Sequence, residues 1–120
     1  MYNFLDTQEW VPVHSLTGYE ACIEYYVNRA GDIKSTKGRI ERLLKLRISK
    51  AGYPTVNLTQ RVGRGKLKTC LVHVLVAFAF LDNSPTPYGK AKGCSVVHHK
   101  DGNKLNCSVK NLEWRQRKSN

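Results

Sequence analysis

Acidic residues are scarce in this chain of 120 residues, where 9 Asp and Glu stand against 20 Lys and Arg. The net charge of +11 at pH 7 and the pI near 9.8 favour a polyanionic partner. A membrane surface would attract the same charge. The basic residues, however, are spread through the chain instead of lying on one amphipathic helix beside a bulky apolar face. This distribution argues against a membrane partner.

Long hydrophobic runs and a secretory signal are also missing. The longest apolar run, residues 71–81, is too short to span a bilayer. The first residues lack the basic start and the long apolar stretch of an export signal. The chain has only four cysteines, and none of them forms a Cys-x-x-Cys pair. We therefore predict reduced thiols in a cytoplasmic protein.

Zinc binding is the alternative use of the cysteines. Such a site would take its ligands from two cysteines and two adjacent histidines, namely Cys94, His98, His99 and Cys107. Structural zinc sites usually draw their ligands from closely spaced pairs. The spacing of these four residues therefore disfavours a zinc-stabilised interaction module.

The length of the whole chain predicts one domain or two very small lobes that share a core. Its first part contains several short β-strand signals. Residues 10–13 favour a first strand, which Pro12 restricts to a sheet edge. Residues 23–28 are rich in Ile, Tyr and Val and favour a second strand. A turn at residues 30–32 precedes a third strand at residues 33–34.

Residues 43–48 alternate apolar and basic side chains. Such alternation is expected of a strand that buries one face and exposes cations on the other. Residues 50–52 then favour a hairpin turn into a strand over residues 53–60. We therefore predict a small antiparallel sheet with Lys45 and Arg47 exposed.

A basic, glycine-containing loop spans residues 61–66. Its cations either contact phosphates or belong to a solvated connection. The apolar run that follows favours a helix over a strand, because Thr69 could cap it, residues 82–85 would stop it, and its length suits a helix. Its single polar member, His73, is expected to be a hydrogen-bonded core residue instead of a ligand.

The C-terminal stretch, residues 94–120, carries residue types that are typical of a site. His98 and His99 close an apolar run. Successive side chains of a strand point to opposite faces, so one packing face does not explain both histidines. A segment rich in Asp, Asn and Gly follows at residues 101–106. We expect this segment to shape a loop through side-chain hydrogen bonds and positive φ angles, not to perform chemistry.

The same stretch resembles the HNH nucleases, a family with the ββα-metal fold. The resemblance rests on Val-His-His-Lys-Asp-Gly-Asn-Lys-Leu-Asn at residues 97–106 and Asn-Leu-Glu-Trp at residues 111–114, as in phage and intron homing endonucleases. The N-terminal half resembles NUMOD4, a small module that precedes HNH domains, through Glu9-Trp10, Gly18-Tyr19, Tyr26-Val27-Asn28, Gly31, Ile33 and Ser35.

The resemblance implies an α+β fold in two parts. A NUMOD4-like module with a small antiparallel sheet would span residues 1–66. A helix and an HNH ββα-metal motif would follow over residues 67–120.

The resemblance also implies a metal-dependent endonuclease of the homing type, which nicks or cuts double-stranded DNA by hydrolysing phosphodiester bonds. His99 is the implied general base, and histidine suits this role because its pKa lies near the operating pH. Asn111 matches the position that braces the loop and orients the base. His98 and Asn120 match the metal ligands. A divalent ion suits the reaction because it binds phosphate oxygens and stabilises the leaving oxygen.

The implied cofactor is one divalent ion, Mg or Mn. Zn and Ni are the alternatives, because His98 stands where the homing branch often has Asp, and a histidine ligand favours transition metals. Several cations are candidates for contacts with DNA. They are Lys45, Arg47, Arg61, Arg64, Lys66, Lys100, Arg115 and Arg117, with Lys104 and Lys118 near the site.

The alternative function is a non-cleaving DNA-binding protein with an incomplete HNH site. It is suggested by the end of the chain at Asn120, where the family continues through a full helix. We expect the natural protein to continue beyond this residue. We also expect a monomer that is encoded by a phage or an intron and acts on DNA in the host cytoplasm.

Overall fold

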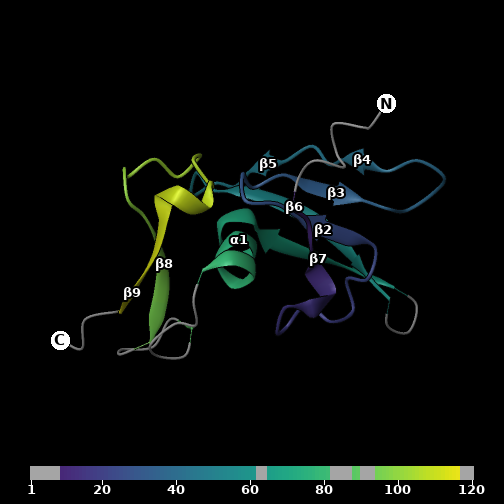
Figure 1. Ribbon diagram of the computed structural model, residues 1–120, viewed down its shortest axis with the longest axis horizontal. Helices are drawn as coiled ribbons and strands as arrows, with labels where there is room; N and C mark the ends of the chain where they lie inside the picture. Colours follow the sequence, from purple (N-terminus) through teal and green to yellow (C-terminus); the bar gives the residue numbers. More distant parts are fainter. Residues whose placement is uncertain (1–8, 62–64, 82–87, 90–93, 117–120) are drawn as a thin grey trace.

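The computed structural model describes residues 9–61, 65–81, 88–89 and 94–116. Within these residues the chain forms three small antiparallel sheets and one α-helix, which is the predicted α+β class. Figure 1 shows the helix between a two-stranded sheet on one side and the N-terminal sheets on the other. In the described part of the chain, no helix has the length and apolar character that a membrane span requires.

The first sheet has the strand order β1-β2-β3-β4. Its strands are β1 (Val11–Pro12), β2 (Tyr25–Val27), β3 (Ile33–Ser35) and β4 (Arg42–Leu43). Pro12 lies on an edge strand, as predicted, because proline has no N–H group for an inner ladder. Val13 does not extend this strand. It begins a short 3-10 helix, η2 (Val13–Ser15), and its side chain is buried in the core.

The second sheet has the order β5-β6-β7. Its strands are β5 (Arg47–Ile48), β6 (Pro54–Gln60) and β7 (Lys66–Leu71). The predicted hairpin turn before β6 is confirmed, and Gly52 adopts a φ angle of 92° there. Glycine suits this position because it carries no Cβ to strain a left-handed backbone.

The prediction of one continuous strand over residues 43–48 is wrong. β4 pairs with β3 in the first sheet, whereas β5 pairs with β6 in the second. Leu44 and Leu46 lie between the two strands and pack against the core, so the chain leaves one sheet and enters the next at this point. Lys45 and Arg47 are exposed, as predicted.

Helix α1 (Val72–Phe80) follows β7 directly and lies at the centre of the molecule. It contacts β2, β6, β7, β8 and β9, which explains why the segment is apolar on nearly all sides. The predicted helix is therefore confirmed, but the predicted cap is wrong. Thr69 lies in β7, where its hydroxyl donates to Asn57 Oδ1 at 2.7 Å. The N-cap position is Leu71, which makes no side-chain cap bond.

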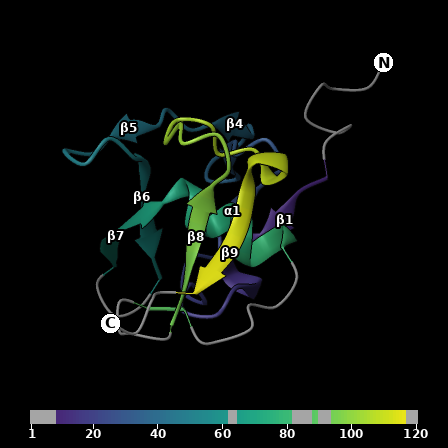
Figure 2. The same ribbon diagram turned by 90° about the vertical axis from the view of Figure 1, so that its left-hand side faces the viewer.

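The third sheet is the antiparallel pair β8 (Ser95–His99) and β9 (Leu112–Gln116). Figure 2 shows the two strands side by side, with α1 behind them. A loop and a short 3-10 helix, η3 (Val109–Asn111), connect the strands. Leu112 anchors the pair to the core, since its side chain is only 1% exposed.

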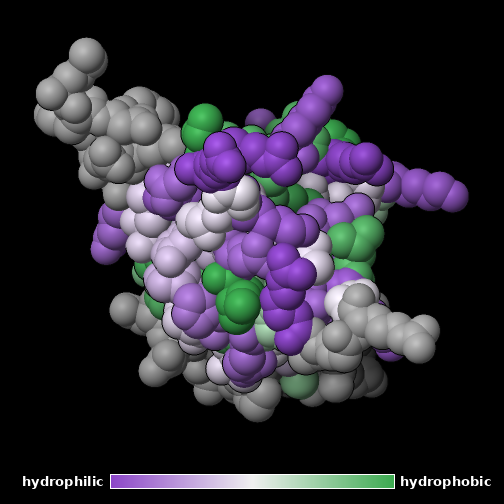
Figure 3. Space-filling model, turned by 90° about the vertical axis from the view of Figure 1, so that its right-hand side faces the viewer, coloured by the Kyte–Doolittle hydropathy of each residue, from purple (hydrophilic) through white to green (hydrophobic). Residues whose placement is uncertain are grey.

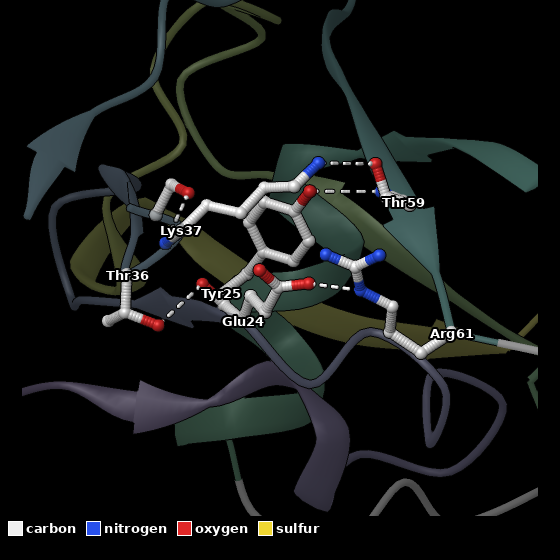
Figure 4. Close-up of polar contacts among 7 residues, drawn as sticks. Glu24, Tyr25, Thr36, Lys37, Thr59 and Arg61 are labelled. Atoms are coloured by element: carbon white, nitrogen blue, oxygen red, sulfur yellow. Dashed lines mark hydrogen bonds and ion pairs between the residues drawn. The ribbon is translucent and has the colours of Figure 1, made fainter. Parts of the chain in front are cut away.

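Polar contacts join the first two sheets, as Figure 4 shows. The hydroxyl oxygen of Tyr25 accepts a hydrogen bond from the N–H of Thr59 at 3.0 Å. Lys37 Nζ donates to Thr59 Oγ1 at 3.3 Å, and Arg61 forms an ion pair with Glu24. These contacts fix β6 against β2.

The predicted boundary between residues 66 and 67 falls at the start of β7, which pairs along its length with β6. The two halves also meet at a turn, where the N–H of Val109 donates to the carbonyl of Arg29 at 2.8 Å. Both halves contribute to one hydrophobic core. The division into residues 1–66 and 67–120 stays a prediction about sequence modules.

Candidate active site

Strand β8 brings the two adjacent histidines to the edge of a cleft. His99 is 7% exposed and pairs across the sheet with Leu112, whereas His98 is half-buried and pairs with Glu113. The difference follows from strand geometry, because neighbouring side chains alternate between the two faces. The structure agrees with the prediction that one packing face does not hold both histidines.

The cleft at the end of β8 is open and has a volume of about 210 Å³. It is lined by Tyr53, Val97, His98, His99, Gly102 and Lys104. A second cleft, of about 270 Å³, shares Tyr53 and Val97 with the first and reaches His73. The fold therefore brings a residue of the N-terminal half, two histidines of β8 and the loop after β8 to one place.

Three rings pack together at this cleft, and we call Tyr53, His73 and His99 the ring cluster. Tyr53 stacks on His73 with ring centroids 5.1 Å apart, and His73 lies 4.8 Å from His99. Tyr53 and His99 are 5.9 Å apart. His73 is a core residue, as predicted, but its Nδ1 atom has no hydrogen-bond partner among the described residues.

Burial keeps the histidines of the ring cluster neutral. Desolvation, followed by the charge of His99, lowers the pKa of His73 to about 4. Desolvation also lowers the pKa of His99, against the opposing effect of Asp101, and His98 and Lys104 add to the lowering. A neutral imidazole at pH 7 retains the nitrogen lone pair that a general base needs.

Asn111 holds the loop that follows β8. Its Oδ1 accepts a hydrogen bond from the N–H of Asp101 at 3.1 Å. Its Nδ2 donates to Asp101 Oδ1 at 2.9 Å and to the carbonyl of Asn106 at 3.0 Å. Hydrogen bonds from the N–H of Asn103, and then from Asn111 and Asn106, lower the pKa of the Asp101 carboxyl. Residues 101–106 thus form loop architecture, as predicted.

The bonds of Asn111 bear on its predicted role. They reach the loop at Asp101 and Asn106, and its backbone carbonyl accepts from the N–H of Lys100 at 2.7 Å. These contacts brace the loop without using the imidazole of His99. The catalytic importance of Asn111 stays a prediction.

Lys104 ties this loop to the β5–β6 turn. Its Nζ donates to the carbonyl of Ala51 at 2.8 Å and lies 4.8 Å from the centroid of the Tyr53 ring. The carbonyl accepts a hydrogen bond from the ammonium group, and the negative face of the ring attracts its charge. Lys104 is a candidate phosphate contact or a solvated cation, and in this structure its ammonium also connects the two halves of the protein.

The predicted metal ligands are only partly described. His98 lies in the cleft, and Asn120 lies outside the described residues. Within the described ranges, no three His, Cys, Asp or Glu side chains lie close enough to hold a metal ion. The alternative zinc site is therefore wrong, because its four residues are all described and form no such group. Cys107 instead packs beside Gly31.

The candidate DNA contacts are spread over several elements. Six of them are exposed in the structure, namely Lys45, Arg47, Arg61, Lys66, Lys100 and Arg115. Arg115 also pairs with Glu113 at 3.1 Å, and the exposed Arg61 pairs with Glu24. Arg64 and Arg117 lie outside the described residues.

Sequence reasoning did not assign Tyr53 and His73 to the site. His73 had a visible signal, because it is the single polar residue of an apolar run. Tyr53 followed a predicted turn and had no signal of its own. The two come together because Thr55 pairs with Leu71, which places the starts of β6 and α1 side by side.

Comparison with known families matches residues 70–120 to the HNH_3 family, described as HNH endonuclease. Residues 70–120 are an HNH endonuclease domain. This HNH domain contains α1, both strands of the β8–β9 sheet and the loop that Asn111 braces. It therefore includes both cleft histidines.

Three curated relatives support the assignment. The chain is 38% identical to DNA endonuclease I-HmuI of Bacillus phage SP01, over 93% of this chain and 55% of the relative. It is 36% identical to H-N-H endonuclease F-TflII of Escherichia phage T5, over 74% and 41% of the two chains. It is 38% identical to the uncharacterized HNH endonuclease L245 of Acanthamoeba polyphaga mimivirus, over 80% and 25%.

A solved structure has the same fold. It is described as DNA binding and cleavage by the HNH homing endonuclease I-HmuI, and it matches with a TM-score of 0.63 and 36% sequence identity. The match covers 90% of this chain and 52% of that chain. This chain thus spans about half the length of I-HmuI, and a smaller share of the other two relatives.

Proposed function

We propose that this protein is a metal-dependent DNA endonuclease of the homing type that hydrolyses phosphodiester bonds of double-stranded DNA. The observation that carries the proposal is the placement of His99, a buried and neutral imidazole that lines an open cleft within the HNH domain. The homology to endonucleases named for DNA cleavage supports the same activity.

His99 is the proposed general base. It would accept a proton from a water molecule as that water attacks the scissile phosphate. The lowered pKa keeps the imidazole unprotonated at neutral pH, and its position on β8 fixes it at the cleft wall. The braced loop at residues 101–106 keeps the rim of the cleft in place.

HNH endonucleases generally depend on a divalent metal ion, and here His98 and Asn120 would hold it. His98 lines the cleft, and its half-buried imidazole offers a nitrogen donor, which fits a transition metal better than magnesium. A bound divalent ion would supply charge stabilisation for the phosphate oxygens. Mn, Zn and Ni are therefore proposed beside Mg.

The surface supports DNA as the substrate. Lys100 and Arg115 are exposed within the HNH domain. Arg47 is exposed in β5, and Lys45 is exposed in the segment between β4 and β5. Figure 3 shows the side of the molecule away from the β8–β9 sheet, which is mainly hydrophilic with separate hydrophobic areas. Cations spread in this way suit a long polyanion that extends past the cleft.

Cleavage of supercoiled plasmid DNA tests the proposal. The purified chain is incubated with Mg, Mn, Ni or Zn ions, and a chelator serves as the control. We expect nicked circles with at least one of these metals and intact plasmid with the chelator. Salt-sensitive DNA binding without cleavage in any metal would instead identify a non-cleaving DNA-binding protein.

Two further expectations belong to this proposal. The protein acts as a monomer, which sedimentation of the purified chain would test. It acts on DNA in the cytoplasm of a host cell, which a fluorescent fusion would test.

A further inference from the structure

The ring cluster contains two buried nitrogen atoms that have no partner among the described residues. They are Nδ1 of His73 and Nε2 of His99. Buried polar atoms in folded proteins are nearly always hydrogen-bonded, so each orphan atom requires an explanation. These two lie on neighbouring rings whose centroids are 4.8 Å apart and whose planes are tilted by 48°.

The burial of Nε2 also indicates which nitrogen of His99 faces the cleft. The Nε2 atom has no contact with solvent, yet the residue lines the cleft. Nδ1 is the other nitrogen of the ring, so a water in the cleft would meet that atom. For Nδ1 to carry the lone pair in a neutral ring, Nε2 must carry the hydrogen. Nε2 then needs a hydrogen-bond acceptor in the protein interior.

His73 is a neighbouring group that can provide this acceptor, since its ring centroid lies 4.8 Å from that of His99. Its imidazole is neutral, so Nδ1 offers a lone pair when Nε2 of the same ring holds the hydrogen. Tyr53 stacks on the His73 ring and restricts the tilting of that ring. The side chain of Asn111 makes its hydrogen bonds to the loop, which leaves the orientation of the base to another residue.

We propose that His73 is a positioning residue for the general base. In one arrangement, Nε2–H of His99 donates directly to Nδ1 of His73 after a small ring rotation. In the other, Nε2–H donates to one buried water, which in turn donates to Nδ1 of His73. In both arrangements the bond selects the tautomer of His99 whose Nδ1 lone pair faces the cleft. This inference rests on the proposed function of His99, but the tautomer itself is measurable without cleavage.

The test compares three forms of the full chain, labelled with ¹⁵N and free of metal at pH 7. They are the wild type, His73→Leu and His73→Asn. Leucine keeps most of the buried volume but has no acceptor, whereas the side-chain oxygen of asparagine lies near the place of Nδ1. Long-range ¹H–¹⁵N spectra of the imidazoles report which nitrogen of each histidine carries hydrogen. Circular dichroism and thermal unfolding report whether each variant is folded.

The wild type is expected to hold His99 in the Nε2–H form and His73 with a bare Nδ1. His73→Leu is expected to show a mixture of the two His99 tautomers, and His73→Asn to restore the single form. A hydrogen on Nδ1 of either histidine in the wild type would overturn the proposal, even if His73→Leu does not fold. An unchanged His99 tautomer in a folded His73→Leu variant would also overturn it.

Plasmid cleavage adds a second readout where the wild type is active. His73→Leu is expected to lower kcat about 10- to 100-fold, by analogy with removal of the hydrogen-bond partner of a metal-bound histidine, with little change in the affinity for DNA. His73→Asn is expected to recover most of the rate. A wild type that shows the expected tautomers but cleaves no DNA would refute the nuclease function and leave the His73–His99 bond standing.

Discussion

Asn111 and Asp101 are joined by two hydrogen bonds, since Asn111 Oδ1 accepts from the Asp101 N–H and Asn111 Nδ2 donates to Asp101 Oδ1. The pair closes the loop between the two strands of the HNH domain. Asn111 is 9% exposed, so solvent replaces these bonds poorly when its side chain is removed. The residue that sequence reasoning placed in the catalytic set is thus also a structural brace.

Asn111→Ala is expected to lower the free energy of unfolding by about 1–3 kcal/mol, because it leaves the buried partners of the side chain without hydrogen bonds. Chemical denaturation of the purified protein measures the change. Asn103→Ala is the control, since Asn103 is exposed and its side chain accepts one local bond from the N–H of Leu105. Equal and small effects in the two variants would show that the hydrogen bonds of Asn111 contribute little to stability.

The turn between β2 and β3 contacts the HNH domain through Gly31. This residue has a φ angle of 92°, and a Cβ atom there would lie 3.1 Å from Cys107 Cβ. Gly31→Ala is expected to cost about 1–2 kcal/mol for the left-handed backbone and an additional amount for the contact. Thermal unfolding measures the total.

Gly18→Ala is the matched control for this prediction. Gly18 has the same φ angle of 92° but no atom within 4 Å of an added Cβ. The difference between the two variants isolates the contact between the halves of the protein. An equal loss of stability in both variants would show that the turn does not pack closely against Cys107.

Stability is expected to fall between about pH 6.5 and pH 4 because of His73. Its pKa is lowered to about 4 in the folded protein, so the unfolded chain binds a proton in this window that the folded protein does not. The free energy of unfolding therefore decreases as the pH falls, by up to about 3 kcal/mol, since each pKa unit corresponds to about 1.4 kcal/mol. Denaturation of the wild type and of His73→Leu at pH 7 and pH 4.5 measures the effect. The same pH dependence in both proteins would contradict the assignment.

DNA binding is expected to depend on Arg47, an exposed cation of β5. Arg47→Ala is expected to weaken binding and to reduce the slope of log K against log salt concentration by about 0.9 for each lost phosphate contact. Arg29→Ala is the control, because this guanidinium is already engaged with Glu9 and the ring of Phe80. Identical salt slopes for Arg47→Ala and the wild type would exclude Arg47 from the DNA interface.

The parts that sequence reasoning predicted are those with local signals. The two histidines at the end of a strand, the loop of Asp, Asn and Gly, and the turn at Gly52 each depend on neighbours in the chain. The basic and apolar alternation over residues 43–48 was misleading, because pairing with β3 and β6 divides the segment between two sheets. The cap predicted at Thr69 failed for a similar reason, since pairing with β6 extends the strand to the start of α1.

Local sequence patterns do not predict the ring cluster. Tyr53 and His73 are separated from His99 in sequence and meet it only when α1 packs between the sheets. An apolar run with one histidine indicates a buried imidazole, but not its neighbour. The orientation of the general base is therefore a property of the tertiary structure.

The most direct test of the nuclease function compares plasmid cleavage and DNA affinity for the wild type, His99→Ala and His14→Ala. His14 is an exposed histidine in η2, outside the cleft, and serves as the control. We predict that His99→Ala lowers the cleavage rate by about 10²- to 10⁴-fold with DNA affinity retained, while His14→Ala behaves as the wild type. Cleavage at the wild-type rate by His99→Ala, or a parallel loss of cleavage and binding, would contradict the assignment of His99 as the general base.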